Sequence, residues 1–78
     1  MKKTYKEYTL ELEGRARFYM GRIGGEVPKP SKEKYYLTAL AICHIIGDFT
    51  GEDRWDVYDR LKQEVLLLKR AVANRVPA

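Results

Sequence analysis

The side chains in this sequence that are most able to do chemistry stand close together, at Cys43, His44 and Asp48. A cysteine with a histidine can act as a nucleophile and its base. Neighbouring residues of a helix point about 100° apart, however, so Cys43 and His44 would not face each other. His44 and Asp48 would, because one helical turn separates them. We therefore expect a histidine oriented by Asp48, a cysteine that packs as a small apolar side chain, no catalytic residues and no enzyme activity.

Two other stretches have the composition of a ligand site without its spacing. The acids at Glu52, Asp53, Asp56 and Asp59 do not follow the pattern of a calcium loop, and a helix dipole alone favours acids at a helix start. The glycines of "GRIGG", residues 21–25, lack the spacing of phosphate-binding loops. One cysteine and one histidine also fall short of a structural zinc set. The sequence predicts no metal and no cofactor.

The chain is short, so its core is expected to need support. Its 78 residues, of which 45% are hydrophobic, make one domain that buries only about 60% of its unfolded surface. A single cysteine cannot close a disulfide within the chain, which leaves burial against another chain. The lone cysteine is also typical of a reducing compartment. The N-terminus has no signal-peptide pattern, and no apolar run approaches the roughly 20 residues of a membrane span. We expect a soluble, cytoplasmic protein that does not bind membranes.

Residues 4–24 fit a helix. Thr4 with Glu7 would form a capping box, and Gly21 or Gly24 would end the helix. Acids and bases four residues apart would pair along it: Glu11 with Arg15, and Glu13 with Arg17. One apolar stripe with steps of three and four is formed by Tyr5, Tyr8, Leu12, Ala16, Tyr19 and Ile23.

The same segment also fits a β-hairpin. Residues 5–23 alternate between polar and apolar, as the two strands of a hairpin that turns near Gly14 would. A glycine inside a helix costs about 1 kcal/mol, which counts against the helix. The loop that would match the two strand faces needs its glycine in last place, however, and Gly14 stands in the middle. Turn chemistry therefore favours the helix, and the hairpin stays as an alternative.

The rest of the chain divides into a connector, two helices and a tail. Two glycines and two prolines break residues 24–31. Ser31 would cap the second helix, Gly47 would end it, and Thr50 would cap the third. Residues 76–78 follow as a tail. The sequence thus predicts a single domain over residues 1–78 with an all-α fold, and the alternative is an α+β fold with the hairpin before two helices. The expected three-helix bundle has helices over residues 4–24, 32–47 and 51–74.

These helices carry more apolar surface than three helices can cover. The second helix is apolar on two faces, and the third has a heptad-like stripe with further leucines beside it. Exposed apolar patches of this size usually mark an interface. We predict a homodimer whose interface centres on the second and third helices, at Tyr35, Tyr36, Leu40, Ile42, Ile45, Leu66 and Leu67. The stripe of the third helix consists of Tyr58, Leu61, Val65, Leu68 and Val72.

The absence of a catalytic pattern favours a function in binding. We predict a protein-binding module, a regulator, adaptor or inhibitor of a larger protein of the kind common on phages and mobile elements. Aromatic residues anchor interfaces, so partner binding is expected at Trp55, Phe18 and Tyr19. The net charge of +4 also suits nucleic acid as an alternative partner. Acids at the start of the third helix count against a helix-turn-helix. Phosphates would instead meet the basic residues Arg15, Arg17, Arg22, Lys69, Arg70 and Arg75.

Overall fold

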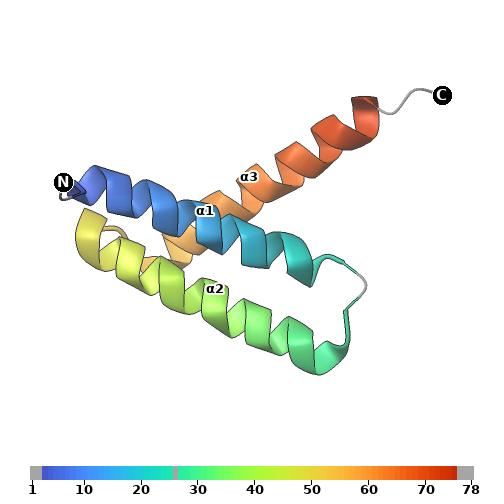
Figure 1. The fold of residues 1–78 in the computed structure, drawn as a ribbon, viewed down its shortest axis with the longest axis horizontal. Helices are drawn as coiled ribbons and strands as arrows, with labels where there is room; N and C mark the ends of the chain where they lie inside the picture. Colours follow the sequence, from blue (N-terminus) through green and yellow to red (C-terminus); the bar gives the residue numbers. More distant parts are fainter. Residues whose placement is uncertain (1–2, 26, 76–78) are drawn as a thin grey trace.

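The computed structural model describes the backbone of residues 3–25 and 27–75, and the side chains of this part up to residue 72. It contains three helices, α1 (Tyr5–Ile23), α2 (Lys29–Thr50) and α3 (Arg54–Arg75), which confirms the all-α, three-helix prediction. Residues 5–23 form a continuous helix and not the alternative hairpin, and the described residues contain no strand. Figure 1 shows α1 and α2 as an antiparallel hairpin, with α3 crossing it and its C-terminal part projecting past the hairpin.

The ends of α1 follow the expected capping chemistry, whereas its ion pairs do not. Thr4 Oγ1 accepts a hydrogen bond from the Glu7 N–H at 3.2 Å, and Gly24 is the C-cap. The predicted pairs within the helix are replaced by pairs to other segments, because the packing of α3 brings charged groups of opposite sign close to α1. The observed pairs are Glu11 with Lys3, Glu13 with Arg60 and Arg17 with Glu64.

The helix α2 begins three residues before its expected start and ends three residues after its expected end. Pro28 and not Ser31 is the N-cap, because Pro30 at the start of the helix loses no hydrogen bond there. Gly47 does not end α2 but is buried inside it. The helix ends instead at Gly51, whose φ of 80° lies in the left-handed region that glycine adopts freely.

The turn between α2 and α3 is tight. Thr50 does not cap α3, since its hydroxyl donates to the Ile46 carbonyl at 3.0 Å, and the Asp53 carboxylate accepts the Trp55 N–H at 2.8 Å instead. A Cβ at Gly47 would lie 2.5 Å from the Glu52 carbonyl oxygen. Glycine is therefore required where the chain returns across the end of α2.

The core lies where the three helices meet. Two cross-helix ion pairs, Arg60 to Glu13 at 2.9 Å and Arg17 to Glu64 at 2.8 Å, flank it. The buried hydrophobic residues of the described part are few and mostly small, so the domain holds together through a short contact zone. They are Ala16, Met20, Ala39, Cys43, Ile46, Val57, Leu61 and Val65.

Replacing Gly47 by alanine is expected to lower the free energy of unfolding by about 1–3 kcal/mol, because the added methyl group must displace the Glu52 backbone. Gly14→Ala is the matched control. Nothing lies within 4 Å of a Cβ at Gly14, so the same change there should stabilise α1 by about 1 kcal/mol. Urea denaturation followed by circular dichroism measures both, and an unchanged midpoint for Gly47→Ala would contradict the close contact.

Candidate interaction surfaces

The Cys43, His44 and Asp48 side chains on α2 lie in different surroundings. Cys43 is fully buried in the core, and this burial raises the pKa of its thiol to about 11. His44 is exposed, with its Nε2 3.8 Å from the Asp48 carboxylate and its Nδ1 3.4 Å from the Arg54 guanidinium. The expected pairing with Asp48 is therefore a close approach, since 3.8 Å is too long for a hydrogen bond. The thiol faces the core and the imidazole faces solvent.

Two of the acids around the start of α3, Glu52 and Asp53, take part in local contacts. Glu52 accepts a hydrogen bond from Arg60 at 3.5 Å, and Asp53 accepts one from the Trp55 backbone. In the part of the chain that the structure describes, no three histidine, cysteine, aspartate or glutamate side chains gather as a metal site would require. These acids satisfy backbone and guanidinium donors at the α2–α3 turn.

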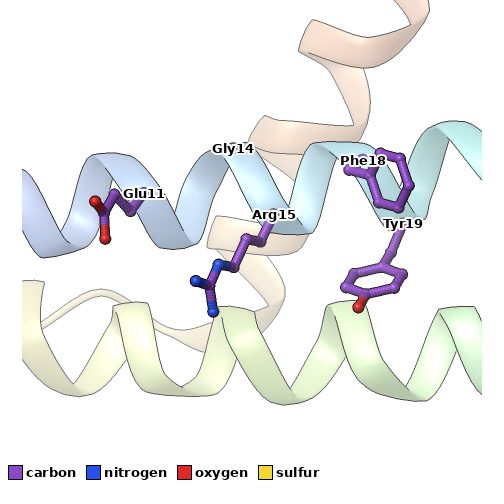
Figure 2. A pocket seen from close by; sticks show the side chains of 5 residues that line it. All are labelled: Glu11, Gly14, Arg15, Phe18 and Tyr19. Carbon is purple, nitrogen blue, oxygen red and sulfur yellow. The ribbon is translucent and has the colours of Figure 1, made fainter.

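Arginine and aromatic side chains gather on one face of α1 and the neighbouring part of α2. Figure 2 shows a shallow groove on α1 in which Arg15 extends toward α2 and the rings of Phe18 and Tyr19 lie one turn away. The Arg22 guanidinium lies 5.5 Å from the Phe18 ring and 5.4 Å from the Tyr35 ring. Tyr19 and Tyr35 stack with ring centres 5.9 Å apart. We call these five residues the aromatic–arginine face.

The other basic residues expected to meet phosphates lie on or beside α3. Arg17 is held by Glu64, and the Lys69 ammonium donates to the Gly21 carbonyl at 3.3 Å. The remaining two are Arg70, which is exposed, and Arg75, whose side chain lies outside the described residues. The six predicted contacts therefore do not form one patch, and only Arg15 and Arg22 share a surface with aromatic rings.

Trp55 lies apart from the other predicted anchors of a partner. It is 46% exposed at the start of α3, and the Arg54 guanidinium lies 5.3 Å from its ring. A shallow pocket at the α2–α3 turn is lined by Trp55 together with His44 and Asp48. Phe18 and Tyr19 belong to the aromatic–arginine face, so the three aromatic residues define two surfaces.

The residues predicted for the dimer interface separate into covered and uncovered groups. Tyr35 stacks on Tyr19, Tyr36 meets the Tyr58 ring at 5.6 Å, and Leu40 and Ile42 are half-buried within the chain. The exposed members are Ile45, Leu66 and Leu67, together with Tyr36, which is 37% exposed despite its contact with Tyr58. Much of the apolar surface of α2 is thus used to hold α1 and α3.

An apolar stripe nevertheless remains uncovered along α2. Leu37, Ala41, Ile45 and Phe49 follow one another at steps of four and are all exposed. The ring of Phe49 contacts that of Tyr5 at 5.5 Å between centres, so the stripe ends beside the start of α1. We call these four residues the α2 stripe.

A second apolar surface lies on residues 66–72, which we call the outer segment of α3 and which projects past the hairpin (Figure 1). Leu67, Leu68 and Val72 are 62%, 60% and 64% exposed. Between the outer segment and α1 lies an open groove of about 640 Å³. Its lining residues are Arg17, Glu64, Leu67, Leu68 and Ala71.

In the outer segment, Leu68 and Val72 were predicted to belong to the stripe of the third helix, but their exposure to solvent was not predicted. Their spacing continues that of Leu61 and Val65, which are buried. No pattern in the sequence indicates the angle at which α3 crosses the hairpin, and this angle determines which residues of α3 are buried. Leu37 and Phe49 were not among the residues predicted for the interface, because the sequence does not show which sides of α2 the other two helices cover.

The fold and its surfaces define a small helical bundle with two uncovered apolar helix surfaces. Comparisons with models of protein families, with curated proteins and with solved structures found no match. Within the described residues, no helix combines the length and the apolar character needed to cross a membrane.

Cys43 is expected to react with a thiol reagent only when the protein unfolds. Burial raises the pKa of its thiol from 9.0 to about 11. As the pH rises, the unfolded chain therefore loses the thiol proton at a lower pH than the folded chain does. The neutral thiol contributes fully to stability below pH 9.0, and this contribution is lost as the pH rises toward about 11. Colorimetric thiol titration near neutral pH, with and without guanidinium chloride, tests this. Rapid labelling of the folded protein would contradict the burial of Cys43.

Proposed function

We propose that the protein is a non-enzymatic binding module that acts in the cytoplasm as a homodimer and docks on a larger protein as its regulator, adaptor or inhibitor. The observation that carries this proposal is the outer segment of α3, a helix surface whose leucines and valine face solvent. Contiguous apolar patches on small proteins usually mark interaction sites. A core of mostly small residues in the described part of the chain also leaves this protein more to gain from association than a larger domain would have.

The uncovered surfaces differ in a way that suits two kinds of contact. The outer segment is one straight helix with a heptad spacing, which is the geometry of helix-to-helix pairing between copies. The α2 stripe and the aromatic–arginine face lie on the α1–α2 hairpin instead. Trp55, Phe18 and Tyr19 are large rings with a polar group or an arginine beside them, the composition of anchors at protein interfaces. We assign docking on the larger protein to these rings.

The mass of the protein in solution tests the homodimer. Light scattering across a dilution series is expected to give twice the chain mass of 9.1 kDa at high concentration and to approach the chain mass on dilution. Raising the salt concentration should leave the dimer in place, because apolar burial is not weakened by ionic screening. A mass of one chain at every concentration and salt condition would overturn the homodimer.

The aromatic–arginine face supports a second candidate function, the binding of single-stranded nucleic acid. Arg15 and Arg22 offer charges to phosphates, and the exposed ring of Phe18 offers a platform on which a base can stack. The Arg22 guanidinium already lies between two rings, so charge and stacking surfaces alternate. This arrangement fits an unpaired strand better than a duplex groove.

Removing both charges is expected to weaken binding to a labelled single-stranded oligonucleotide. In fluorescence anisotropy, the double variant Arg15→Ala and Arg22→Ala should lower the slope of log affinity against log salt concentration. Each lost phosphate contact lowers the slope by about 0.7, so the expected change is about 1.4. The matched control, Lys6→Ala with Lys62→Ala, removes the same charge from exposed positions outside the face. Equal losses in both double variants would mean that net charge alone attracts the oligonucleotide, and would refute the face as a site.

A further inference from the structure

The stripe of α3 that faces the core does not end where the core ends. Leu61 is fully buried and Val65 is 9% exposed, whereas Leu68 and Val72 are 60% and 64% exposed. All four belong to one side of the helix, because their steps of four, three and four keep them in line. After crossing the hairpin at an angle, α3 diverges from it, so this end lies away from the hairpin (Figure 1). Half of a core-forming stripe is thus left without a cover.

The uncovered half borders a groove with one charged end. Leu67, Leu68 and Ala71 form its apolar side, and the ion pair of Arg17 with Glu64 at 2.8 Å closes it at the base of the outer segment. Ala71 is the smallest of these side chains and permits a close approach by another backbone. A helix with apolar residues at heptad spacing is the shape that such a surface accepts.

We propose that the occupant is the outer segment of α3 from a second copy, which lies antiparallel across a two-fold axis near Leu67. This inference rests on the proposed homodimer and names its surface. A two-fold contact uses the same patch on both copies, so one pairing covers Leu67 and Leu68 of each chain at once. The α2 stripe stays free in this dimer and remains open to a different partner.

The charges of α3 select the antiparallel direction. Lys69 and Arg70 are basic, and the sequence carries no acid after Glu64. Parallel pairing would bring these basic turns together, and like charges repel. An antiparallel pair centred near Leu67 places Arg70 of one copy level with Glu64 of the other, because each stands three residues from the axis. The antiparallel pairing therefore separates the basic turns of the two copies and sets each beside the Arg17–Glu64 ion pair of the other.

The first experiment compares two leucines with the same exposure. Leu67 and Leu37 are each 62% exposed, one in the outer segment and the other in the α2 stripe. Leu67→Glu is expected to raise the dimer dissociation constant at least about tenfold, because it places two carboxylates at the axis. Leu37→Glu should leave the constant unchanged. Circular dichroism tests whether both variants keep their helices, and light scattering measures their masses.

Crosslinking then tests the direction of pairing. Under mild oxidation, Leu67→Cys should form a disulfide between copies, since a bond needs Cα atoms within about 7 Å. Val72→Cys should not, because in the antiparallel pair the two positions are about 15 Å apart along the helices, at about 1.5 Å per residue. The buried Cys43 of the unchanged chain serves as the unreactive control.

The outcomes separate this inference from the homodimer itself. A dimer that survives Leu67→Glu and gives no disulfide with Leu67→Cys would overturn the outer-segment interface and leave the homodimer standing. Dissociation by Leu37→Glu alone would move the interface to the α2 stripe. Efficient crosslinking of Val72→Cys would overturn the antiparallel direction. A monomeric mass of the unchanged protein at every concentration would overturn the homodimer and this inference together.

Discussion

The crossing of α3 over the α1–α2 hairpin is the contact on which the rest of the structure depends. Val57, Leu61 and Val65 bring α3 into the core, and the small side chains at Ala16 and Ala39 let the helices approach closely. Arg60 lies beside this crossing and pairs with acids from α1, from the α2–α3 turn and from its own helix. Because α3 crosses the hairpin and does not lie along it, the core is short, and apolar surface remains uncovered on α2 and on the outer segment.

Electrostatics distinguishes the aromatic–arginine face and the outer segment of α3, which carry basic residues, from the Trp55 surface, which is lined by Asp48, Glu52 and Asp53. The acids of α1 are largely matched by bases, since Glu11 pairs with Lys3 and Glu13 with Arg60. Arg22 lies against the Phe18 and Tyr35 rings, Arg15 extends toward α2 beside the same groove, and Arg70 is exposed on α3. Part of the net charge of +4 thus lies on exposed arginines. The resulting positive potential speeds the approach of acidic partners of any class. For the proposed binding function, these basic and apolar surfaces would suit a partner with an acidic rim around an apolar patch.

The sequence favoured the three observed helices but left a hairpin open for residues 5–23, and it was less informative about the helix ends and the site. Apolar steps of three and four identify all three helices, and Thr4 fixes the first because its cap needs only local chemistry. Gly47 was taken as a helix end because a glycine there has that local meaning, whereas the actual reason is the Glu52 backbone against it, a contact no local pattern contains. The pairs of Glu13 and Arg17 were misassigned for the same reason, since their partners are about 47 residues away in the chain. Residues 76–78 lie outside the described part, so the predicted tail stays a prediction.

Because the outer segment is the proposed dimer contact, the ordered length of α3 is expected to depend on the protein concentration. Residues 66–72 extend past the hairpin and are exposed, although the Lys69 ammonium donates to the Gly21 carbonyl at 3.3 Å. Short helical stretches with few buried contacts are marginal in water. Their amide hydrogens are then the first to exchange in a single chain, while Leu61 and Val65 protect the turns before them. A neighbour that packs on Leu68 and Val72 would slow this exchange one turn after another. The degree of helical order at the end of α3 therefore indicates whether a partner covers the outer segment.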